Sequence, residues 1–302
     1  MNVLSLCDGM SCGQIALKEL GINVDKYYAA EIEKNAIKVT QDNFPDTIQI
    51  GDVTKISEDF LKTLPKIDLV MFGSPCRSLS KAVAGREKYD KGLNGVSWLF
   101  YPCNNILQWI KKNNNLNVKF LVENVDSYHT DDLNIITNAL DTNPIMIDSA
   151  LFSAQRRKRN YWTNIKLDEI PVEESNLFLY NILEDNPNEK YYYKQTFTLH
   201  DENLSIRATL DIKGHDIIRR VYSKYSKCPT LTCCRGGNLQ KKVFDEERQL
   251  CRKLTPLEYR RLQTIPDWYK MNVSDSAIYN LCGDGWTIEV IKFILKNLKN
   301  ED

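Results

Sequence analysis

The chain has 302 residues, of which 42% are hydrophobic and 26% are charged, and its formal net charge is zero. This is the composition of a globular protein with one large domain or two unequal ones. No apolar run approaches the roughly 18 residues that a membrane span needs, and the start of the chain lacks the basic flank of a secretory signal. Nine cysteines without such a signal predict reduced thiols in the cytoplasm, and neither they nor the three histidines are spaced as metal ligands.

The first half of the chain alternates short apolar runs with amphipathic stretches, which predicts βαβ units, a parallel sheet and an α/β fold. The predicted strands are Asn2–Leu6, Lys26–Ala30, Thr47–Ile50, Ile67–Phe72, Val118–Val122, Ile145–Ala150 and Asn160–Thr163. The predicted helices between them are Gly13–Leu20, Lys34–Asn43, Ser97–Ile110 and Asp131–Leu140. Seven strands of this kind predict a doubly wound, Rossmann-like sheet.

The second half has a different pattern. From Lys166 to Leu254 the periodicity is poor, which predicts a smaller, irregular domain. Thr255–Gln263, with proline in its first turn, and Thr287–Leu298 then read as helices. The expected domains are therefore residues 1–165, 166–254 and a closing segment, 255–302, that returns to the first domain.

Charge is unevenly distributed in this second half. Residues 213–261 hold 13 Lys and Arg against 5 Asp and Glu, an excess of eight positive charges. Residues 166–211 hold 4 basic and 10 acidic residues, an excess of six negative charges. A basic block of this kind is often only a solvated face, but it also suits a surface that meets phosphates.

One cysteine follows a predicted buried strand directly. Leu69–Phe72 is followed by Gly-Ser-Pro and then Cys76, at the carboxyl edge of the predicted sheet, where ligands of open α/β folds bind. Pro75 fixes its own φ and restrains Ser74, so the thiol is held in place. A thiolate held there predicts a nucleophile.

Three other strand ends predict a nucleoside pocket. Cys7–Gly13 is a glycine-containing turn between a strand and a helix, Glu31 ends the second strand, and Asp52 follows the third. Glycine lets backbone approach a ligand, and a strand-end carboxylate can bind ribose hydroxyls. The turn lacks the Gly-x-Gly-x-x-Gly spacing of dinucleotide sites, which disfavours a nicotinamide enzyme. A nucleoside without a phosphate site suits S-adenosylmethionine.

Two further motifs supply polar groups to the same region. Glu123 ends the fifth strand and places an acid near Cys76. In Gln155–Arg159 alternate residues share one side, so Arg157 and Arg159 can both point to the cleft and hold a base carbonyl or a phosphate.

Six motifs now stand in a fixed order: Asp8-Gly-x-x-x-Gly13, Gly73-Ser-Pro-Cys76, Glu123-Asn-Val125, Gln155-x-Arg-x-Arg159, Arg261-Leu-Gln-x-x-Pro-Asp267 and Gly283-x-x-Trp286. This series resembles DNA (cytosine-5) methyltransferases over nearly the whole chain except residues 166–254. Its details resemble the catalytic domain of the vertebrate de novo branch, and its compact size resembles bacterial and phage enzymes.

The resemblance implies a role for each matching residue. Cys76 would attack C6 of a cytosine flipped out of the duplex, Glu123 would hydrogen-bond or protonate N3, and Arg157 and Arg159 would hold the base. The cofactor would be S-adenosylmethionine, with contacts from Asp8, Gly9, Met10, Ser11, Cys12, Glu31, Ile32, Asp52, Val53, Ser74, Pro75, Asp284, Gly285 and Trp286.

Double-stranded DNA is the partner that the resemblance implies, with residues 166–254 as the target-recognition domain. The candidate contacts are Arg77, Ser80, Arg219, Arg220, Lys224, Arg235, Asn238, Lys241 and Lys242. No metal and no membrane are expected, and a monomer and a weak homo-oligomer both stay open. A cytoplasmic protein close to the nucleoid of a bacterial or phage-infected cell is expected, with restriction-modification, marking and phage self-protection as open roles.

Three residues depart from the family pattern. Arg77 stands where many members have Gln or Asn, and Cys7 replaces the usual aromatic residue after the first strand. Asp284 stands where Asn is common and where the de novo branch has Arg. A carboxylate at that position would either pair with the cofactor ammonium or repel its carboxylate.

Two alternatives keep part of this interpretation. The first is methylation of tRNA, as in the tRNA-methylating branch of the same superfamily, against which Gly-Ser-Pro-Cys rather than Pro-Pro-Cys speaks. The second is a methyltransferase-like regulator that binds DNA without chemistry, although such relatives typically lose the nucleophile or the cofactor pocket.

Overall fold

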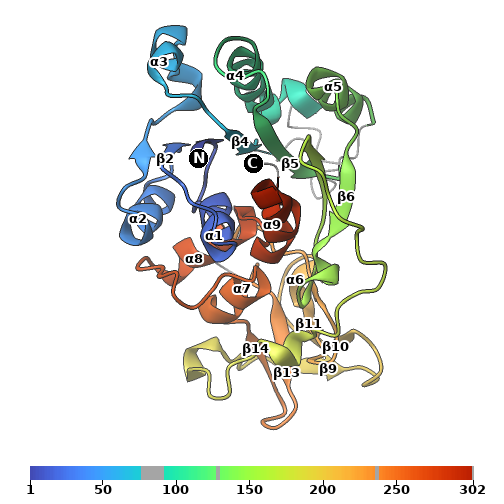
Figure 1. Ribbon diagram of the computed structural model, residues 1–302. Helices are drawn as coiled ribbons and strands as arrows, with labels where there is room; N and C mark the ends of the chain where they lie inside the picture. The colour runs from blue at the N-terminus through green and yellow to red at the C-terminus, as the bar shows by residue number, and fades with distance from the viewer. Residues whose placement is uncertain (76–91, 127–129, 235–237, 301–302) are drawn as a thin grey trace. The chain divides into compact units, whose positions relative to one another are not determined.

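The protein is described by a computed structural model that covers residues 1–75, 92–126, 130–234 and 238–300 (Figure 1). Its chain forms two compact units. Unit 1 comprises Met1–Ile147, Lys158–Ile170 and Ile291–Asp302, and unit 2 comprises Asp148–Arg157 and Pro171–Val290. The chain thus leaves unit 1 after Ile147 and returns to it at Lys158, within the predicted Gln155–Arg159 motif.

A seven-stranded sheet organises unit 1 (Figure 1). Its strands, in spatial order, are β3 (Ile48–Gln49), β2 (Lys26–Ala30), β1 (Asn2–Leu6), β4 (Leu69–Gly73), β5 (Lys119–Val125), β8 (Lys158–Thr163) and β6 (Ile145–Asp148). The central strands are apolar on both faces because helices cover both, as in other α/β folds. The predicted Rossmann-like α/β fold and all seven predicted strands are confirmed.

The direction of one strand differs from the prediction. β1 runs parallel to β2 and β4, and β4 runs parallel to β5, but β8 runs antiparallel to β5. The expectation of a wholly parallel sheet is therefore wrong. A parallel crossover needs a dozen or more residues, and only residues 149–157 separate β6 from β8.

Helices cover the sheet of unit 1. These helices are α1 (Cys12–Glu19), α2 (Lys34–Asn43), α3 (Glu58–Thr63), α4 (Phe100–Asn113), α5 (Thr130–Leu140) and the end of α9 (Ile288–Leu295). α3, α4 and α5 share one hydrophobic cluster with side chains of β1, β4 and β5. α1 packs tightly on the opposite face, because a Cβ on Gly13 would lie 2.4 Å from Met71 Cε.

Unit 2 contains a five-stranded sheet where an irregular domain was expected. Its strands, in spatial order, are β14 (Leu250–Lys253), β13 (Lys242–Asp245), β11 (Arg220–Tyr222), β10 (Ile206–Leu210) and β9 (Phe197–Leu199). A separate pair joins β12 (Cys228–Pro229) to β7 (Gln155–Arg156). Strands of three to five residues are too short for their alternation to stand out in the sequence, which explains the wrong expectation.

Three helices accompany this sheet: α6 (Asp216–Arg219), α7 (Pro256–Leu262) and α8 (Asp275–Asp284). α7 begins as predicted, because Thr255 and Glu258 form a capping box and proline occupies the first turn. It packs on α8 through Tyr259 and Tyr279, whose rings lie 4.6 Å apart at a steep angle. Among the described residues, no helix has the length and hydropathy to cross a bilayer.

Candidate functional site

The turn after β1 has an unusual backbone. Gly9 and Ser11 have φ of 58° and 56°, in the left-handed region. Asp8 anchors the turn from within, because its carboxylate accepts hydrogen bonds from Tyr27 Oη at 2.8 Å and from Ser11 Oγ. Burial of this carboxylate raises the pKa of Asp8 to about 6. A Cβ on Gly9 would meet nothing within 4 Å, so the backbone at the tip of the turn is open to a ligand.

Glu31 joins this turn to the end of β2. Its Oε2 accepts from Gly9 N at 2.7 Å, and its Oε1 accepts from the backbone N–H groups of Ile32 and Glu33, each at 2.8 Å. Ile32 beside it is 70% exposed, an unusual position for a large apolar side chain. Asp52 Oδ1 accepts from Thr54 N and Oγ1, and Asp52 Oδ2 lies 3.9 Å from Lys55 Nζ.

These groups fit the nucleoside part of S-adenosylmethionine. Carboxylates at two neighbouring strand ends can accept from ribose hydroxyls and from an adenine amino group. The exposed Ile32 offers an apolar surface to a base, and the open turn at Gly9 allows close approach. The polar groups of this region are carboxylates and backbone groups rather than cations, which suits a ligand without phosphate.

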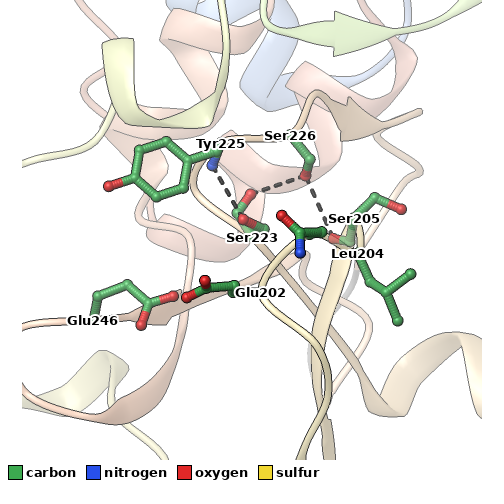
Figure 2. A pocket seen from close by; sticks show the side chains of 8 residues that line it. Glu202, Leu204, Ser205, Ser223, Tyr225, Ser226 and Glu246 are labelled. Carbon is green, nitrogen blue, oxygen red and sulfur yellow. Dashed lines mark hydrogen bonds between the residues drawn. The ribbon is translucent and has the colours of Figure 1, made fainter.

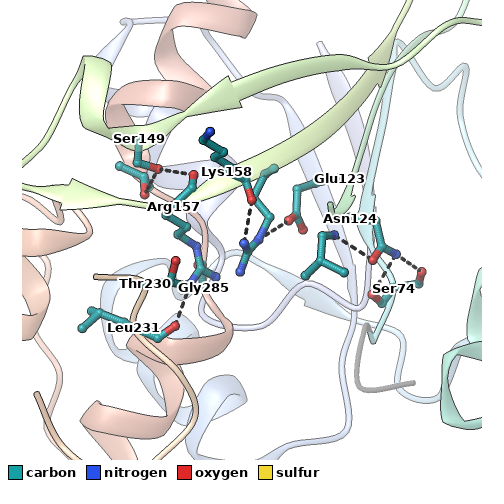
Figure 3. Close-up of polar contacts among 12 residues, drawn as sticks. Ser74, Glu123, Asn124, Ser149, Arg157, Lys158, Thr230, Leu231 and Gly285 are labelled. Carbon is teal, nitrogen blue, oxygen red and sulfur yellow. Dashed lines mark hydrogen bonds and ion pairs between the residues drawn. The ribbon is translucent and has the colours of Figure 1, made fainter. Parts of the chain in front are cut away.

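The ends of β4 and β5 lie side by side, with Gly73 paired to Glu123. Asn124, which is 2% exposed, donates from Nδ2 to Ser74 Oγ at 3.2 Å, and the same atom lies 3.5 Å from Ser74 O (Figure 3). Asn124 therefore holds the residue that precedes Pro75. Cys76, Arg77 and Ser80 lie outside the described residues.

Glu123 is paired with Arg159 of β8 (Figure 3). Arg159 Nε lies 3.0 Å from Glu123 Oε1, and the two side chains are 13% and 11% exposed. Arg159 Nη1 also donates to Lys158 O at 2.8 Å. The structure thus brings together two of the predicted catalytic residues, a carboxylate and a guanidinium, in unit 1.

The guanidinium of Arg157 binds backbone carbonyl groups of unit 2. Its Nη1 donates to Leu231 O at 2.9 Å, and its Nη2 donates to the carbonyl oxygens of Gly283 and Gly285, each at 3.0 Å (Figure 3). The residue is only 4% exposed. A guanidinium bound to three backbone carbonyls holds segments in place, and this arrangement does not fit the expectation that Arg157 holds the base.

The segments that Arg157 joins are packed closely. A Cβ on Gly283 would lie 2.5 Å from Cys233 N and from the carbonyl carbon of Thr232, so this position has room only for glycine. Cys233 Sγ donates to Asp284 Oδ1 at 2.5 Å. Asp284, the residue that departs from the family pattern, therefore accepts a hydrogen bond from within the protein.

Sequence reasoning did not assign three buried polar residues of unit 2. Gln155 Nε2 donates to Gln263 Oε1 at 3.2 Å, and Thr287 Oγ1 donates to the same oxygen at 2.8 Å. Gln155 Oε1 accepts from Leu231 N at 2.8 Å. Their signal was present, because these residues lie in or beside three of the quoted motifs, and the network explains why those motifs contain glutamine.

Several cations of the basic block are used inside unit 2. Lys242 is 1% exposed and donates to the carbonyl oxygens of Asn238 and Gln240, at 2.7 and 2.9 Å. Burial lowers the pKa of Lys242 to about 8. A contact between this ammonium and DNA phosphate does not fit such burial, and we exclude Lys242 from the candidate DNA contacts.

The other candidates in this block differ in their surroundings. Arg219 Nε donates to Leu210 O at 3.0 Å, and Arg220 pairs with Asp216. Lys224 lies 5.4 Å from the ring centre of Tyr225, which is exposed. Asn238 Oδ1 accepts from Tyr193 Oη at 3.1 Å, Lys241 is partly exposed, and Arg235 lies outside the described residues.

A polar hollow of ≈ 720 Å³ lies elsewhere in unit 2 (Figure 2). Its lining residues are Glu202, Asn203, Leu204, Ser205, Ser223, Tyr225, Ser226 and Glu246. Ser226 Oγ donates to Ser223 O at 2.8 Å and to Ser205 O at 3.4 Å, and Glu246 pairs with Arg207 at 3.0 Å. No residue predicted for the active site or the cofactor lines this hollow.

Comparison with known proteins gives consistent results. The model of the C-5 cytosine-specific DNA methylase family matches residues 1–300. The orphan methyltransferase M.SPBetaI of Bacillus phage SPbeta is 24% identical, and the match covers 99% of this chain and 97% of the relative. The type II methyltransferase M.HhaI of Haemophilus parahaemolyticus is 26% identical, over 99% of this chain and 94% of the relative.

Two solved structures have the same fold. The Dnmt2 methyltransferase of S. pombe matches with a TM-score of 0.70 at 17% identity, over 99% of this chain and 98% of that chain. The methyltransferase EhMeth of Entamoeba histolytica matches with a TM-score of 0.69 at 14% identity, over 100% of this chain and 99% of that chain.

Proposed function

The chain belongs to the C-5 cytosine-specific DNA methylase family, and we propose that it methylates C5 of a cytosine in double-stranded DNA through a covalent adduct with Cys76. Enzymes of this family take the methyl group from S-adenosylmethionine. The base would be flipped out of the duplex, because its ring is unreachable within the base stack.

The observation that carries this proposal is the arrangement at the ends of β4, β5 and β8. Asn124 binds Ser74, two residues before Cys76, and Glu123 is paired with Arg159 on the neighbouring strand. A nucleophile at one strand end and an acid at the next are what addition to a pyrimidine ring requires.

Each residue would have a separate task. The Cys76 thiolate forms a bond to C6 of cytosine, and Glu123 hydrogen-bonds or protonates N3, so that the electron pair displaced from the ring is stabilised and C5 becomes nucleophilic. When bound, S-adenosylmethionine supplies an electrophilic methyl group. Transfer of the C5 proton to water and departure of Cys76 as a thiolate would then restore the aromatic ring. Arg159 is paired with Glu123 and would orient it, and its remaining N–H groups would bind the base carbonyl.

For the cofactor, we propose that Glu31 and Asp52 accept from the ribose and the adenine, and that Ile32 packs on the base. Asp8 acts indirectly, since its carboxylate holds Ser11 and Tyr27 and thereby shapes the turn. Met10, Cys12 and Val53 are buried next to these groups and would support them. The roles of Ser74, Pro75, Asp284, Gly285 and Trp286 stay predictions from the resemblance.

We propose residues 166–254 as the target-recognition region. Lys224 and Lys241 are the described cations best suited to phosphate, and Arg220 would first have to leave Asp216. Arg77, Ser80 and Arg235 remain candidates from the sequence alone. Because few cations are available to phosphate, DNA binding should weaken as salt rises. The logarithm of the binding constant should fall with the logarithm of the salt concentration by roughly 0.9 for each phosphate contact.

Methylation of unmethylated genomic DNA tests this proposal. The purified protein is incubated with S-adenosylmethionine, and 5-methylcytosine is mapped at base resolution, with Cys76→Ser in parallel and Cys251→Ala as a control cysteine from the core of unit 2. We expect methylation at one short motif with the wild type and the control, and none with Cys76→Ser. Methylation of tRNA but not of duplex DNA would replace the proposed substrate. DNA binding without methylation of either nucleic acid would overturn the proposed chemistry.

A further inference from the structure

Two thiols face each other next to the cofactor turn. Cys7 Sγ and Cys103 Sγ lie 3.9 Å apart, although 96 positions separate the residues in the sequence. Cys7 is the first residue after β1 and begins the cofactor turn, and Cys103 lies in the first turn of α4. Both residues belong to unit 1.

The two thiols differ in access. Cys103 is completely buried, whereas Cys7 is partly exposed and packs against the edge of the hydrophobic cluster. Cys7 has φ of 53°, which bends the chain out of β1 and leaves its side chain between the core and the surface. An oxidant from solvent therefore meets Cys7 first, and Cys103 is in place to resolve the product.

We propose that Cys7 and Cys103 are a disulfide-forming pair, a modification site at which a peroxide oxidises the cofactor turn. Cys7 thiolate attacks one oxygen of hydrogen peroxide, the O–O bond breaks, and with one proton the products are a sulfenic acid and water. Cys103 sulfur then attacks the Cys7 sulfur, a second water leaves with the thiol proton, and the disulfide forms. In sum, two thiols are oxidised and one peroxide is reduced to two waters.

The geometry requires only a short movement. A disulfide has an S–S bond of about 2.05 Å, so the sulfur atoms must approach by roughly 2 Å. Rotation of the partly exposed Cys7 side chain, with a small shift of its backbone, provides this distance. The contact with Cys7, together with burial, raises the pKa of Cys103 well above its ordinary value, so Cys103 stays a thiol and its proton leaves with the water of the second step.

A disulfide at Cys7 would affect cofactor binding through the hydrogen bonds of the next two residues, Asp8 and Gly9. Asp8 N donates to Ala30 O at 3.1 Å, and Gly9 N donates to Glu31 Oε2 at 2.7 Å. A disulfide would draw Cys7 toward α4 and pull on both bonds, which align the turn with Glu31. We expect the oxidised protein to bind the cofactor product, S-adenosylhomocysteine, at least fivefold more weakly. This consequence rests on the proposed function, whereas formation of the disulfide does not.

The experiment uses the full chain with Cys76→Ser, so that oxidation of the proposed nucleophile has no part in the result. The protein is treated with hydrogen peroxide, free thiols are blocked with N-ethylmaleimide, and disulfide-linked peptides are identified by mass spectrometry. Affinity for S-adenosylhomocysteine is measured by calorimetry before oxidation, after oxidation, and after reduction with dithiothreitol. Matched variants add Cys7→Ser, which removes the pair, or Cys251→Ala, which removes a thiol from the core of unit 2, away from the residues assigned to the cofactor.

We expect a linked Cys7–Cys103 peptide, at least fivefold weaker binding after oxidation, and recovery on reduction. Cys251→Ala should retain all three results, and Cys7→Ser should lose them. Absence of the linked peptide while other thiols are oxidised would overturn the proposal, as would a disulfide that leaves the affinity unchanged. If the reduced protein does not bind S-adenosylhomocysteine at all, the proposed function fails, and the peptide map still decides whether the disulfide forms.

Discussion

Arg157 and Arg159 are two residues apart in one motif, but their guanidinium groups have different partners, so lysine at each position should have different effects. A lysine ammonium is a point donor and cannot reach the three carbonyl oxygens that Arg157 binds at 2.9 to 3.0 Å. If two of these bonds are lost, at about 1.5 kcal/mol for each bond with a charged donor, the free energy of unfolding falls by about 3 kcal/mol.

Arg159→Lys should instead leave stability nearly unchanged. The ammonium can keep an ion pair with Glu123, and both side chains reach solvent in part, so the free energy of unfolding should change by less than about 1 kcal/mol. Loss of the planar donor beside the base should lower kcat by roughly 10²–10³-fold, as removal of one preorganised donor does in other enzymes.

Urea unfolding followed by circular dichroism, with kcat measured on the same samples, separates the two effects. With a slope near 3 kcal/mol per molar urea, Arg157→Lys should lower the midpoint by roughly 1 M, and Arg159→Lys should shift it by much less. A wild-type midpoint for Arg157→Lys, combined with a loss of kcat as large as that of Arg159→Lys, would refute the positioning role of Arg157.

Further expectations concern one close contact, one buried cation and one positioning residue. Gly283→Ala should destabilise the protein by about 1–3 kcal/mol, because the added Cβ meets backbone at 2.5 Å. Gly13→Ala should cost less, because its added Cβ meets the flexible end of a methionine side chain. Equal shifts of the thermal midpoint in the two variants would contradict this reasoning. Lys242 has a folded pKa of about 8 against 10.5 when unfolded, so the unfolded chain binds more protons between these values and stability rises with pH. Between pH 7 and pH 10 the free energy of unfolding should rise less in Lys242→Met than in the wild type, by on the order of 2 kcal/mol. Urea unfolding at both pH values measures this difference. Identical pH profiles of the two proteins would show that the ammonium is not buried. Asn124→Ala releases Ser74 and should lower kcat at least tenfold, and an unchanged kcat would remove Asn124 from the positioning residues.

The sheet of unit 1 was predictable because its strands are continuous apolar runs between helices with a clear period. β1 and β2 begin and end at the predicted residues, and only the direction of β8 differed, since strand direction depends on the length of a connection rather than on its residues. Short elements were missed: α3 has six residues and α8 has weak amphipathicity, so neither gives a clear helical pattern.

For the candidate site, the types of the residues and their order along the chain predicted which residues belong to the site. The hydrogen-bond and ion-pair partners of those residues could not be predicted from the sequence. The alternation in Gln155–Arg159 predicted that Arg157 and Arg159 share one side of the chain, but the chain passes from unit 2 to unit 1 between them. The carboxylate that Arg159 meets lies on another strand, and the carbonyl groups that Arg157 binds lie more than 70 residues away in the sequence. No local pattern carries that information.

The basic block illustrates the same point for charge. The short strands of unit 2 leave many carbonyl groups at strand ends and in loops, and each buried carbonyl needs a donor. Long cations satisfy several at once: Lys227 Nζ donates to the carbonyl oxygens of Ser153, Ser175 and Leu177, and Arg252 forms a two-pronged pair with Glu258. Such cations stabilise the unit from within and are not available to a phosphate. A count of charges along this sequence therefore overestimates the number of DNA contacts, and the electrostatic part of DNA binding must come from the smaller set that stays at the surface.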